Sequence, residues 1–233
     1  MRKIRIFTYN ILRKLKDEYS VINDTLIAVM NFFGRNKVKI QGKRNQIISR
    51  GGVWRKRCVI NITGNHNIIK LEKGVRLEHV TINIYGNHNR IYLSERVLMK
   101  DGEFYIEDDG NSIVIGKDTA LCGKVQLSCI EGTGIKIGND CLFSSEIIFR
   151  TGDSHSVVDM EGNRLNQSKD IILEDHVWVG SRVTVLKGVK ISANSVIAAG
   201  SVVTRKFENI NVAIGGNPAK IIKREINWTR ERI

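Results

Sequence analysis

The fold is decided by residues 173–203, which read LEDHVWVGSRVTVLKGVKISANSVIAAGSVV. An aliphatic residue recurs there at every sixth position: Leu173, Val179, Val185, Ile191, Ile197 and Val203. This period matches neither the 3.6-residue period of a helix face nor the alternation of an ordinary strand. It is typical of a coil that turns a corner once per hexad and points one small apolar residue inward. Three hexads close a triangle of about 18 residues, and triangles stack as parallel strands about 4.8 Å apart. The segment therefore predicts a parallel β-helix.

A longer repeat precedes this segment. Corner sequences that begin with glycine recur 22 to 24 residues apart, at Gly42, Gly64, Gly86, Gly110 and Gly132, and an apolar run follows each one. Glycine and asparagine tolerate the left-handed backbone that tight corners need. We interpret these repeats as earlier coils of the same β-helix, each lengthened by a few residues at one corner. This gives about eight coils over residues 37–216.

The pattern predicts three parts. Residues 1–36 are expected to be a basic amphipathic helical segment, because apolar residues recur there at helical spacing between Lys and Arg residues. The stripe consists of Ile4, Phe7, Ile11, Leu12 and Leu15, and a second helix is expected over Val21–Phe33. Residues 37–216 form the β-helix. Residues 217–233 form a C-terminal cap and tail, for which we expect a short helix containing Trp228.

Charge is concentrated at one end of the chain. The net charge is +13, and residues 1–57 hold 15 Lys and Arg against three acidic residues. This asymmetry favours an anionic neighbour, such as a membrane surface or an acidic polysaccharide, and nucleic acid is not expected. A basic face that only aids solubility is the alternative.

The sequence favours a cytoplasmic protein, with a peripheral position at the inner face of the membrane as a further option. No signal peptide or apolar segment long enough to span a bilayer is visible. Four widely spaced cysteines are expected to be buried, reduced thiols.

One interval interrupts the hexads. Between Phe149 and Leu173 the chain runs through Asp153, Ser154 and His155 and then a polar stretch to Asp170. A long polar loop that leaves a regular solenoid is usually functional. We therefore look for the chemistry in this interval.

These motifs together resemble one family. The run Asp-Ser-His-Ser (153–156), His-Val-Trp-Val-Gly (176–180), the stacked hexads, and Gly-Asn-Pro-Ala-Lys (216–220) occur in the same order in hexapeptide-repeat acyltransferases. The resemblance is strongest to the branch that O-acetylates bacterial surface polysaccharides, and it covers about residues 110–223. Residues 37–109 resemble that branch more loosely.

The resemblance implies a fold, a partner and a co-substrate. The fold is a left-handed parallel β-helix, the assembly is a homotrimer with active sites between subunits, and the co-substrate is acetyl-CoA. The residues that match the family's coenzyme site are Trp178, Gly180, Ala198, Ala199, Gly200, Thr204, Arg205, Pro218 and Lys220. The chain departs from the family pattern at Val179, where isoleucine is usual, and at Arg205-Lys206, where a Lys-Asp pair is common.

His155 matches the family's catalytic histidine. Histidine can take and return a proton at neutral pH, because its reference pKa is about 6.5. A neighbouring carboxylate, Asp153 or Asp159, is expected to orient the ring, as in other His–acid pairs. We assign Asp153 to the catalytic set, and Ser145, Arg150 and Arg164 to acceptor binding.

His66 and His88 occupy equivalent repeat positions and are expected to stack. A zinc site of three histidines from adjacent coils is the alternative, but the same position holds Arg44 one coil earlier and Ser112 one coil later. No metal is expected.

The leading hypothesis is an acetyl-CoA-dependent O-acetyltransferase that acts on a sugar hydroxyl of a capsule, O-antigen or related glycan, or of its lipid-linked precursor. N-acetylation of a nucleotide-linked amino sugar is one alternative. A non-catalytic β-helical binding scaffold is the other.

Overall fold

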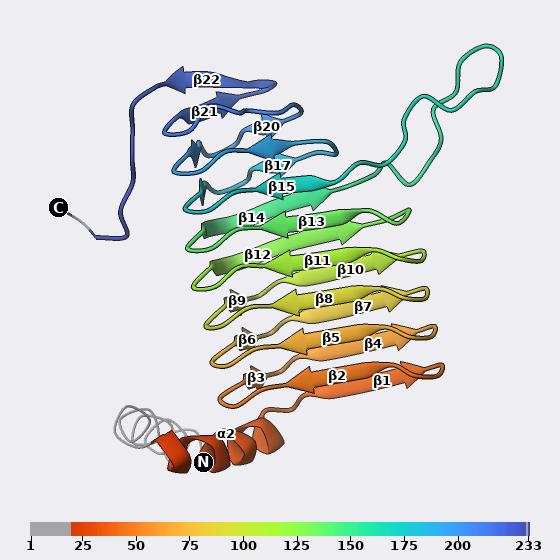
Figure 1. Ribbon diagram of the computed structural model, residues 1–233, viewed down its shortest axis with the longest axis vertical. Coiled ribbons are helices and arrows are strands. Elements are labelled where there is room, and N and C mark those ends of the chain that lie inside the picture. Colours follow the sequence, from red (N-terminus) through yellow and green to blue (C-terminus); the bar gives the residue numbers. More distant parts are fainter. Residues whose placement is uncertain (1–19, 232) are drawn as a thin grey trace.

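The chain winds into a three-sided prism of about eight coils, as predicted (Figure 1). The computed structural model describes residues 20–231 and 233. One helix, α2 (Ser20–Phe33), lies across the lower end of the prism, so the prediction of a helix over Val21–Phe33 is confirmed. Asn31, near its end, donates to the carbonyl of Val53 at 2.9 Å and accepts from the N–H of Arg55 at 2.7 Å, which ties α2 to the first coil. The predicted stripe from Ile4 to Leu15 lies outside the described residues.

The prism has three faces, which we call first, second and third. The first face contains β3 (Trp54–Lys56), β6 (Arg76–Glu78), β9 (Leu98–Lys100), β16 (Trp178–Val179), β19 (Val196–Ile197) and β21 (Ala213–Gly216). The second face contains β1 (Lys37–Gln41), β4 (Val59–Thr63), β7 (Thr81–Tyr85), β10 (Glu103–Glu107), β17 (Thr184–Val185) and β20 (Val202–Val203). The third face contains β2 (Gln46–Ser49), β5 (Ile68–Leu71), β8 (Arg90–Leu93), β11 (Ser112–Ile115), β13 (Gly134–Ile137), β15 (Ile171–Leu173) and β18 (Lys190–Ile191).

Two long strands bend around one corner of the prism. β12 (Ala120–Cys129) and β14 (Leu142–Arg150) each begin on the first face and end on the second. Among the described strands, those of neighbouring coils pair in parallel, and only β22 (Ala219–Lys223) runs antiparallel, beside β21. The chain passes through the faces in the order second, third, first.

The register explains both repeats in the sequence. In the lower coils Val59 pairs with Thr81, a step of 22 residues, whereas in the upper coils Trp178 pairs with Val196, a step of 18. The extra residues of the lower coils form the predicted Gly-Asn corner between the second and third faces. Buried asparagines stack there; Asn89, for example, accepts from the N–H of Asn111 at 2.8 Å and donates to the carbonyl of Asp108 at 2.9 Å. Each buried amide therefore satisfies backbone groups that the tight corner leaves without a strand partner.

The core is a column of inward aliphatic and aromatic side chains. All six residues of the hexad series are buried, from Leu173 to Val203, and Phe143 and Phe149 fill the wider coil below them. Burying one such side chain contributes about 1.5–3 kcal/mol. Since every coil buries several such side chains, the stack of coils firmly supports the loops and side chains on its surface. Cys58, Cys129 and Cys141 are buried as expected, whereas Cys122 points outward and is exposed.

The prediction of a helical tail is wrong. After β22 the chain runs back down the outside of the prism, and residues 224–231 contain no helix (Figure 1). The backbone of Ile226 exchanges hydrogen bonds with Asn211, the N–H donating at 3.0 Å and the carbonyl accepting at 3.0 Å. The corner of the prism thus pairs with backbone groups of the tail, and these groups would have bonded to one another in a helix.

Candidate active site

A long loop leaves the prism between β14 and β15, where the hexads stop, and projects away from it (Figure 1). Its tip folds on itself. The carboxylate of Asp159 accepts from the backbone N–H groups of Glu161 and Asn163 at 3.0 and 2.7 Å, and Val158 and Arg164 form an antiparallel bridge. Asp159 therefore stabilises the tip of the loop.

The base of the loop is tied to the coil below. Arg164 makes an ion pair with Glu131 at 2.8 Å, and the Ser168 hydroxyl donates to the same carboxylate at 2.6 Å. The ion pair lowers the pKa of Glu131. The predicted acceptor residue Arg164 thus has a structural partner at the base of the loop.

His155 lies on the outgoing arm of the loop, exposed, beside Ser154 at a positive φ of 63°. The side-chain amide of Asn166, on the returning arm, donates to the His155 carbonyl at 2.7 Å and to the Asp153 carboxylate at 2.8 Å. Asn166 therefore holds the two arms together directly at the histidine. Sequence reasoning missed this residue, because nothing local marks an asparagine that acts across 11 positions.

The Asp153 carboxylate contacts Lys187 as well as Asn166. The Lys187 ammonium holds the pKa of Asp153 below its usual range. Within residues 20–231 the His155 imidazole makes no hydrogen bond to Asp153 or Asp159, so the orientation of the ring by a carboxylate stays a prediction.

Trp178 lies on the first face. Its inward neighbour Val179 is fully buried, while Trp178 points outward and is 38% exposed, as the alternation predicts. The indole N–H lies 3.5 Å from the hydroxyl of Ser144. At the adjoining corner Gly180, Ala198 and Gly215 stack coil upon coil; the backbone N–H of Gly180 donates to Ile197 and that of Ala198 to Ile214, each at 2.8 Å. These small residues leave a smooth strip beside the indole, along which a linear ligand can lie flat.

The C-terminal tail packs beside Trp178 through Trp228. Trp228 is buried and stacks on the imidazole of His176, with ring centroids 4.2 Å apart and planes 10° from parallel. Its indole N–H donates to the His176 carbonyl at 2.9 Å, and its ring centroid lies 6.1 Å from that of Trp178. The tail thus braces the tryptophan of the candidate site, a contact between residues 50 positions apart that the sequence did not reveal.

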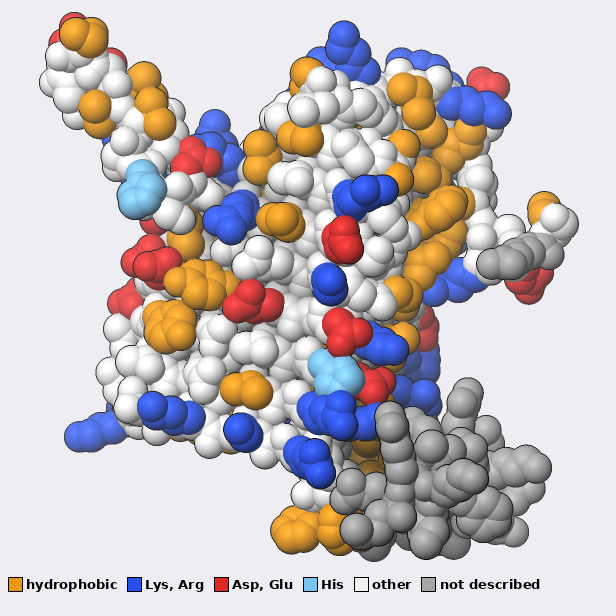
Figure 2. All heavy atoms as spheres, turned by 180° about the vertical axis from the view of Figure 1, so that it is seen from behind, with side chains coloured by type: hydrophobic (Ala, Val, Ile, Leu, Met, Phe, Trp, Pro, Cys, Tyr) orange, Lys and Arg blue, Asp and Glu red, His pale blue; other side chains and the backbone are white. Residues whose placement is uncertain are grey.

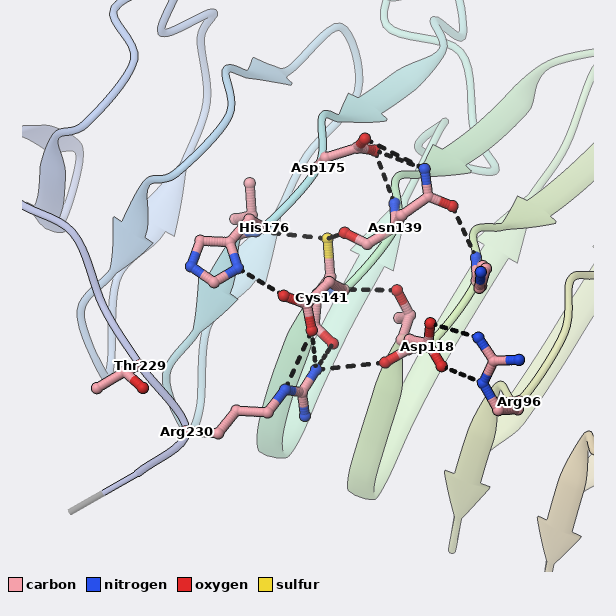
Figure 3. A network of polar contacts seen from close by, with 12 residues as sticks. Arg96, Asp118, Asn139, Cys141, Asp175, His176, Thr229 and Arg230 are labelled. Atoms are coloured by element: carbon pink, nitrogen blue, oxygen red, sulfur yellow. Dashed lines mark hydrogen bonds and ion pairs between the residues drawn. The ribbon is translucent and has the colours of Figure 1, made fainter.

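An ion-pair network holds the tail in place (Figure 3). Asp140 contacts the Nδ1 atom of His176 at 2.7 Å and the Arg230 guanidinium at 2.9 Å. Burial raises the pKa of Asp140, but the hydrogen bonds from His176 and Arg230 together outweigh it and leave that pKa lowered. Arg230 also donates to the carbonyls of Asp118 and Cys141, so it spans two coils.

Other predicted coenzyme residues meet at the upper end of the prism. Arg205 and Lys220 line one hollow of about 610 Å³, together with Lys206 and Arg224, and Glu208 is the acidic residue in its wall. Thr204 follows β20, and Pro218 lies in the turn between β21 and β22. This hollow is strongly basic and suits a phosphate group.

Apart from the residues at the upper end, the predicted residues form two separate groups within one copy of the chain. Trp178, Gly180, Ala198 and Ala199 lie on or beside the first face, and Ser145 is close by, with its hydroxyl 3.3 Å from that of Ser181. His155, Asp153 and Arg164 belong to the loop at the corner between the second and third faces, and Arg150 ends β14 directly before that loop. In a three-sided prism this corner lies opposite the first face. The two groups therefore point away from each other.

Comparison with known proteins relates this geometry to a family. Residues 170–205 match the family described as bacterial transferase hexapeptide (six repeats). A polysialic acid O-acetyltransferase of Escherichia coli O1:K1 / APEC is 34% identical over 122 residues, which are 52% of this chain and 39% of the relative. A galactoside O-acetyltransferase of Lactococcus lactis subsp. lactis (strain IL1403) is 33% identical over 124 residues, which are 53% of this chain and 58% of the relative. The matches thus span about half the length of these curated relatives.

A solved structure extends the likeness to the whole prism. The crystal structure of NeuO, a polySia-specific acetyltransferase, aligns with a TM-score of 0.77 and 32% identity over 84% of this chain and 89% of that chain. The chain belongs to the hexapeptide-repeat acetyltransferases. Their left-handed parallel β-helix is the predicted fold, and the surface-polysaccharide branch is the one that the sequence resembled.

The stacking predicted for two histidines of this acetyltransferase is also confirmed. The rings of His66 and His88 lie 4.8 Å apart and 7° from parallel. No helix among the described residues is long and apolar enough to cross a membrane.

Proposed function

We propose that this hexapeptide-repeat acetyltransferase transfers the acetyl group of acetyl-CoA to a hydroxyl of a bacterial surface glycan, with His155 as the general base. The observation that carries the proposal is the placement of His155. It lies exposed on a loop that Asn166 and Arg164 hold at its base, in a fold shared with sugar O-acetyltransferases. A held, exposed imidazole can meet a hydroxyl that arrives from solvent.

The reaction needs one proton to move twice. The His155 imidazole takes the proton of the sugar hydroxyl while that oxygen attacks the thioester carbonyl. The carbon–sulfur bond then breaks, and the imidazolium returns its proton to the departing thiolate. The products are an acetyl ester on the glycan and free CoA, so the histidine ends as it began.

The same proposal assigns acetyl-CoA to the first face and the upper end of the prism. Trp178 and the strip of Gly180 and Ala198 flank the pantetheine arm, and Arg205 and Lys220 meet the phosphates. Since Arg205 and Lys220 already share one basic hollow, the two cations can neutralise phosphate charge without rearrangement.

A complete site requires a second copy of the chain, and we propose the family's homotrimer. A column of outward apolar residues runs up the first face: Leu98, Ala120, Leu142, Trp178, Val196 and Ala213. Figure 2 shows hydrophobic side chains gathered along the right edge of the upper half of the molecule. A loop that projects from one copy can bring His155 to the Trp178 of the next.

We also propose that the basic N-terminal end recruits an anionic partner, either a membrane surface or an acidic polysaccharide. Lys37, Lys39 and Lys43 are exposed on the first coil. The triple variant Lys37→Gln/Lys39→Gln/Lys43→Gln should raise KM for an acceptor on anionic vesicles if the partner is a membrane, and for a soluble acidic polymer if it is a polysaccharide. Unchanged KM in both assays would contradict this role.

Acceptor screening tests the proposed reaction. The protein is incubated with acetyl-CoA and a panel of glycans, free CoA thiol is measured, and products are analysed by mass spectrometry before and after mild alkali. The proposal predicts thiol release that depends on one class of glycan and an added acetyl group that alkali removes. An alkali-stable acetyl group would indicate an amide and N-acetylation. Absence of acetyl transfer to every glycan would contradict the proposal.

A further inference from the structure

The second face carries a column of polar and aromatic side chains that leads to the candidate catalytic loop. Register places one residue of each coil in this column: Lys39, Asn61, Asn83, Tyr105, Ser128 and Arg150. Arg150 ends β14, and the loop that bears His155 begins at the next residue. Adjacent members are about 4.8 Å apart, because each lies on the neighbouring parallel strand. This spacing is close to the length of one sugar ring in an extended glycan chain.

Two tyrosines give the middle of this face an apolar platform. Tyr85 is 42% exposed, Tyr105 is half-buried, and their ring centroids lie 5.8 Å apart at an interplanar angle of 55°. Both occupy outward positions of their strands, β7 and β10, which alternate with buried positions. Tyrosine combines a broad apolar ring with a polar tip, and such rings stack on the C–H face of a pyranose.

A ladder of planar polar groups runs beside the tyrosines. The Asn61 amide donates to Asn83 at 2.9 Å, and Asn83 donates to the Glu103 carboxylate at 3.0 Å. Gln126 donates to the other oxygen of Glu103 at 3.1 Å. These groups are half-buried and fixed by one another, so they are held ready to exchange hydrogen bonds with ring hydroxyls.

Charge on this stretch selects the kind of glycan. Glu103 lies in the ladder, and Glu107 accepts from the Tyr105 hydroxyl at 3.2 Å. In Figure 2, which views the molecule from behind, hydrophobic and acidic side chains lie together at the left edge below the projecting loop, whereas Lys and Arg gather at the lower end. Two carboxylates beside the aromatic platform disfavour a sugar that carries its own carboxylate.

We propose that the second face is a binding track for a glycan chain whose residues are uncharged where they cross Tyr85 and Tyr105. The inference rests on the proposed function, because the track ends at the loop that bears His155. The chain would run along the prism axis, with its acetylated residue at the loop and several further residues on the platform. The acceptor is then an oligomer or polymer rather than a single sugar.

Binding without acetyl-CoA tests the track separately from the reaction. Neutral oligosaccharides of one to eight residues, built from glucose, galactose or N-acetylglucosamine, are titrated into the full-length protein, beside oligosialic acids of matched length. We expect at least one neutral series to bind with affinity that rises with length, and to bind more tightly than the sialic acid series. The double variant Tyr85→Ala/Tyr105→Ala should weaken the longer ligands about tenfold or more.

Tyr92→Ala is the matched control, because Tyr92 lies on the third face beside Lys70. It should leave glycan binding unchanged, and melting temperatures confirm that all variants fold. The proposal is overturned if no neutral series binds, if the double variant binds as the wild type does, or if oligosialic acid binds more tightly. Length-independent acetylation of a monosaccharide would remove the track and leave the proposed function standing. Binding that strengthens with glycan length, without acetyl transfer, would support the track and contradict the proposed function.

Discussion

At residue 155 the imidazole makes no hydrogen bond, among the described residues, to the carboxylates that flank it in the sequence. Asp153 is held by Lys187 and Asn166, and Asp159 shapes the loop tip. What fixes the histidine is its backbone, through the amide of Asn166. The proposed base therefore depends on a loop that is rigid at its base.

Replacing His155 with alanine should lower kcat by about 100-fold or more, because a positioned general base contributes that much. The melting temperature should not change, since the side chain is exposed. His88→Ala is the control, because it removes a histidine from a corner three coils below the loop without touching the loop. A His155→Ala variant that kept more than about a tenth of the activity would rule out the assignment.

Gly64, in the Gly-Asn corner, has no room for a side chain. Gly64 has φ +129°, and a Cβ built on it would collide with the Gly86 carbonyl of the next coil. Gly64→Ala should lower the free energy of unfolding by about 3 kcal/mol or more in denaturant titrations. Gly110→Ala, at φ +75° with open space around it, should cost only about 1–2 kcal/mol. Equal losses of unfolding free energy in the two variants would show that the positive φ, and not the close approach of the next coil, sets the cost of a side chain at this corner.

At the scale of elements, the strands were predictable and the tail was not. Every hexad residue from Leu173 to Val203 points inward, because the period of a coil is a local property of the sequence. The tail has no such period. Its course depends on His176 and Asp140, which lie about 50 and 90 positions away from their partners Trp228 and Arg230. The partners of Asp153 escaped prediction for the same reason, since Lys187 reaches it from the next coil.

Trp228→Ala should raise KM for acetyl-CoA about three- to tenfold, because the tail then no longer braces Trp178. The change in kcat should be smaller, since His155 lies on the loop at another corner. Trp54→Ala serves as the control, because Trp54 occupies the first face in the lowest coil. If both variants shift KM equally, the effect is general and the tail has no specific role.

Acid should release the tail. The pKa of Asp140 is lowered in the folded protein, so its carboxylate stabilises the docked state at pH values above its unfolded pKa of about 3.9. That stability is lost as the pH falls through the lower folded value. Trp228 fluorescence should therefore report undocking below about pH 4, and Asp140→Asn should remove this transition. The same acid transition in Asp140→Asn would assign it to another group.

At the scale of the whole molecule, the prism separates the two halves of the proposed site. The loop with His155 leaves one corner, and the first face with Trp178 lies opposite. The sequence placed both residues in one active site through the family resemblance, and the topology explains why a single copy cannot join them. In the proposed trimer, each copy would give a histidine to one neighbour and a tryptophan to the other.

Activity of mixed trimers tests this account most directly. Subunits carrying His155→Ala and subunits carrying Trp178→Ala, each nearly inactive alone, are co-expressed with different tags, and trimers containing both are isolated. If each site joins the histidine of one copy to the tryptophan of the next, one site in every mixed trimer is intact, and acetyl transfer returns to about a third of wild type. Mixed trimers no more active than the two parents would contradict an active site between copies.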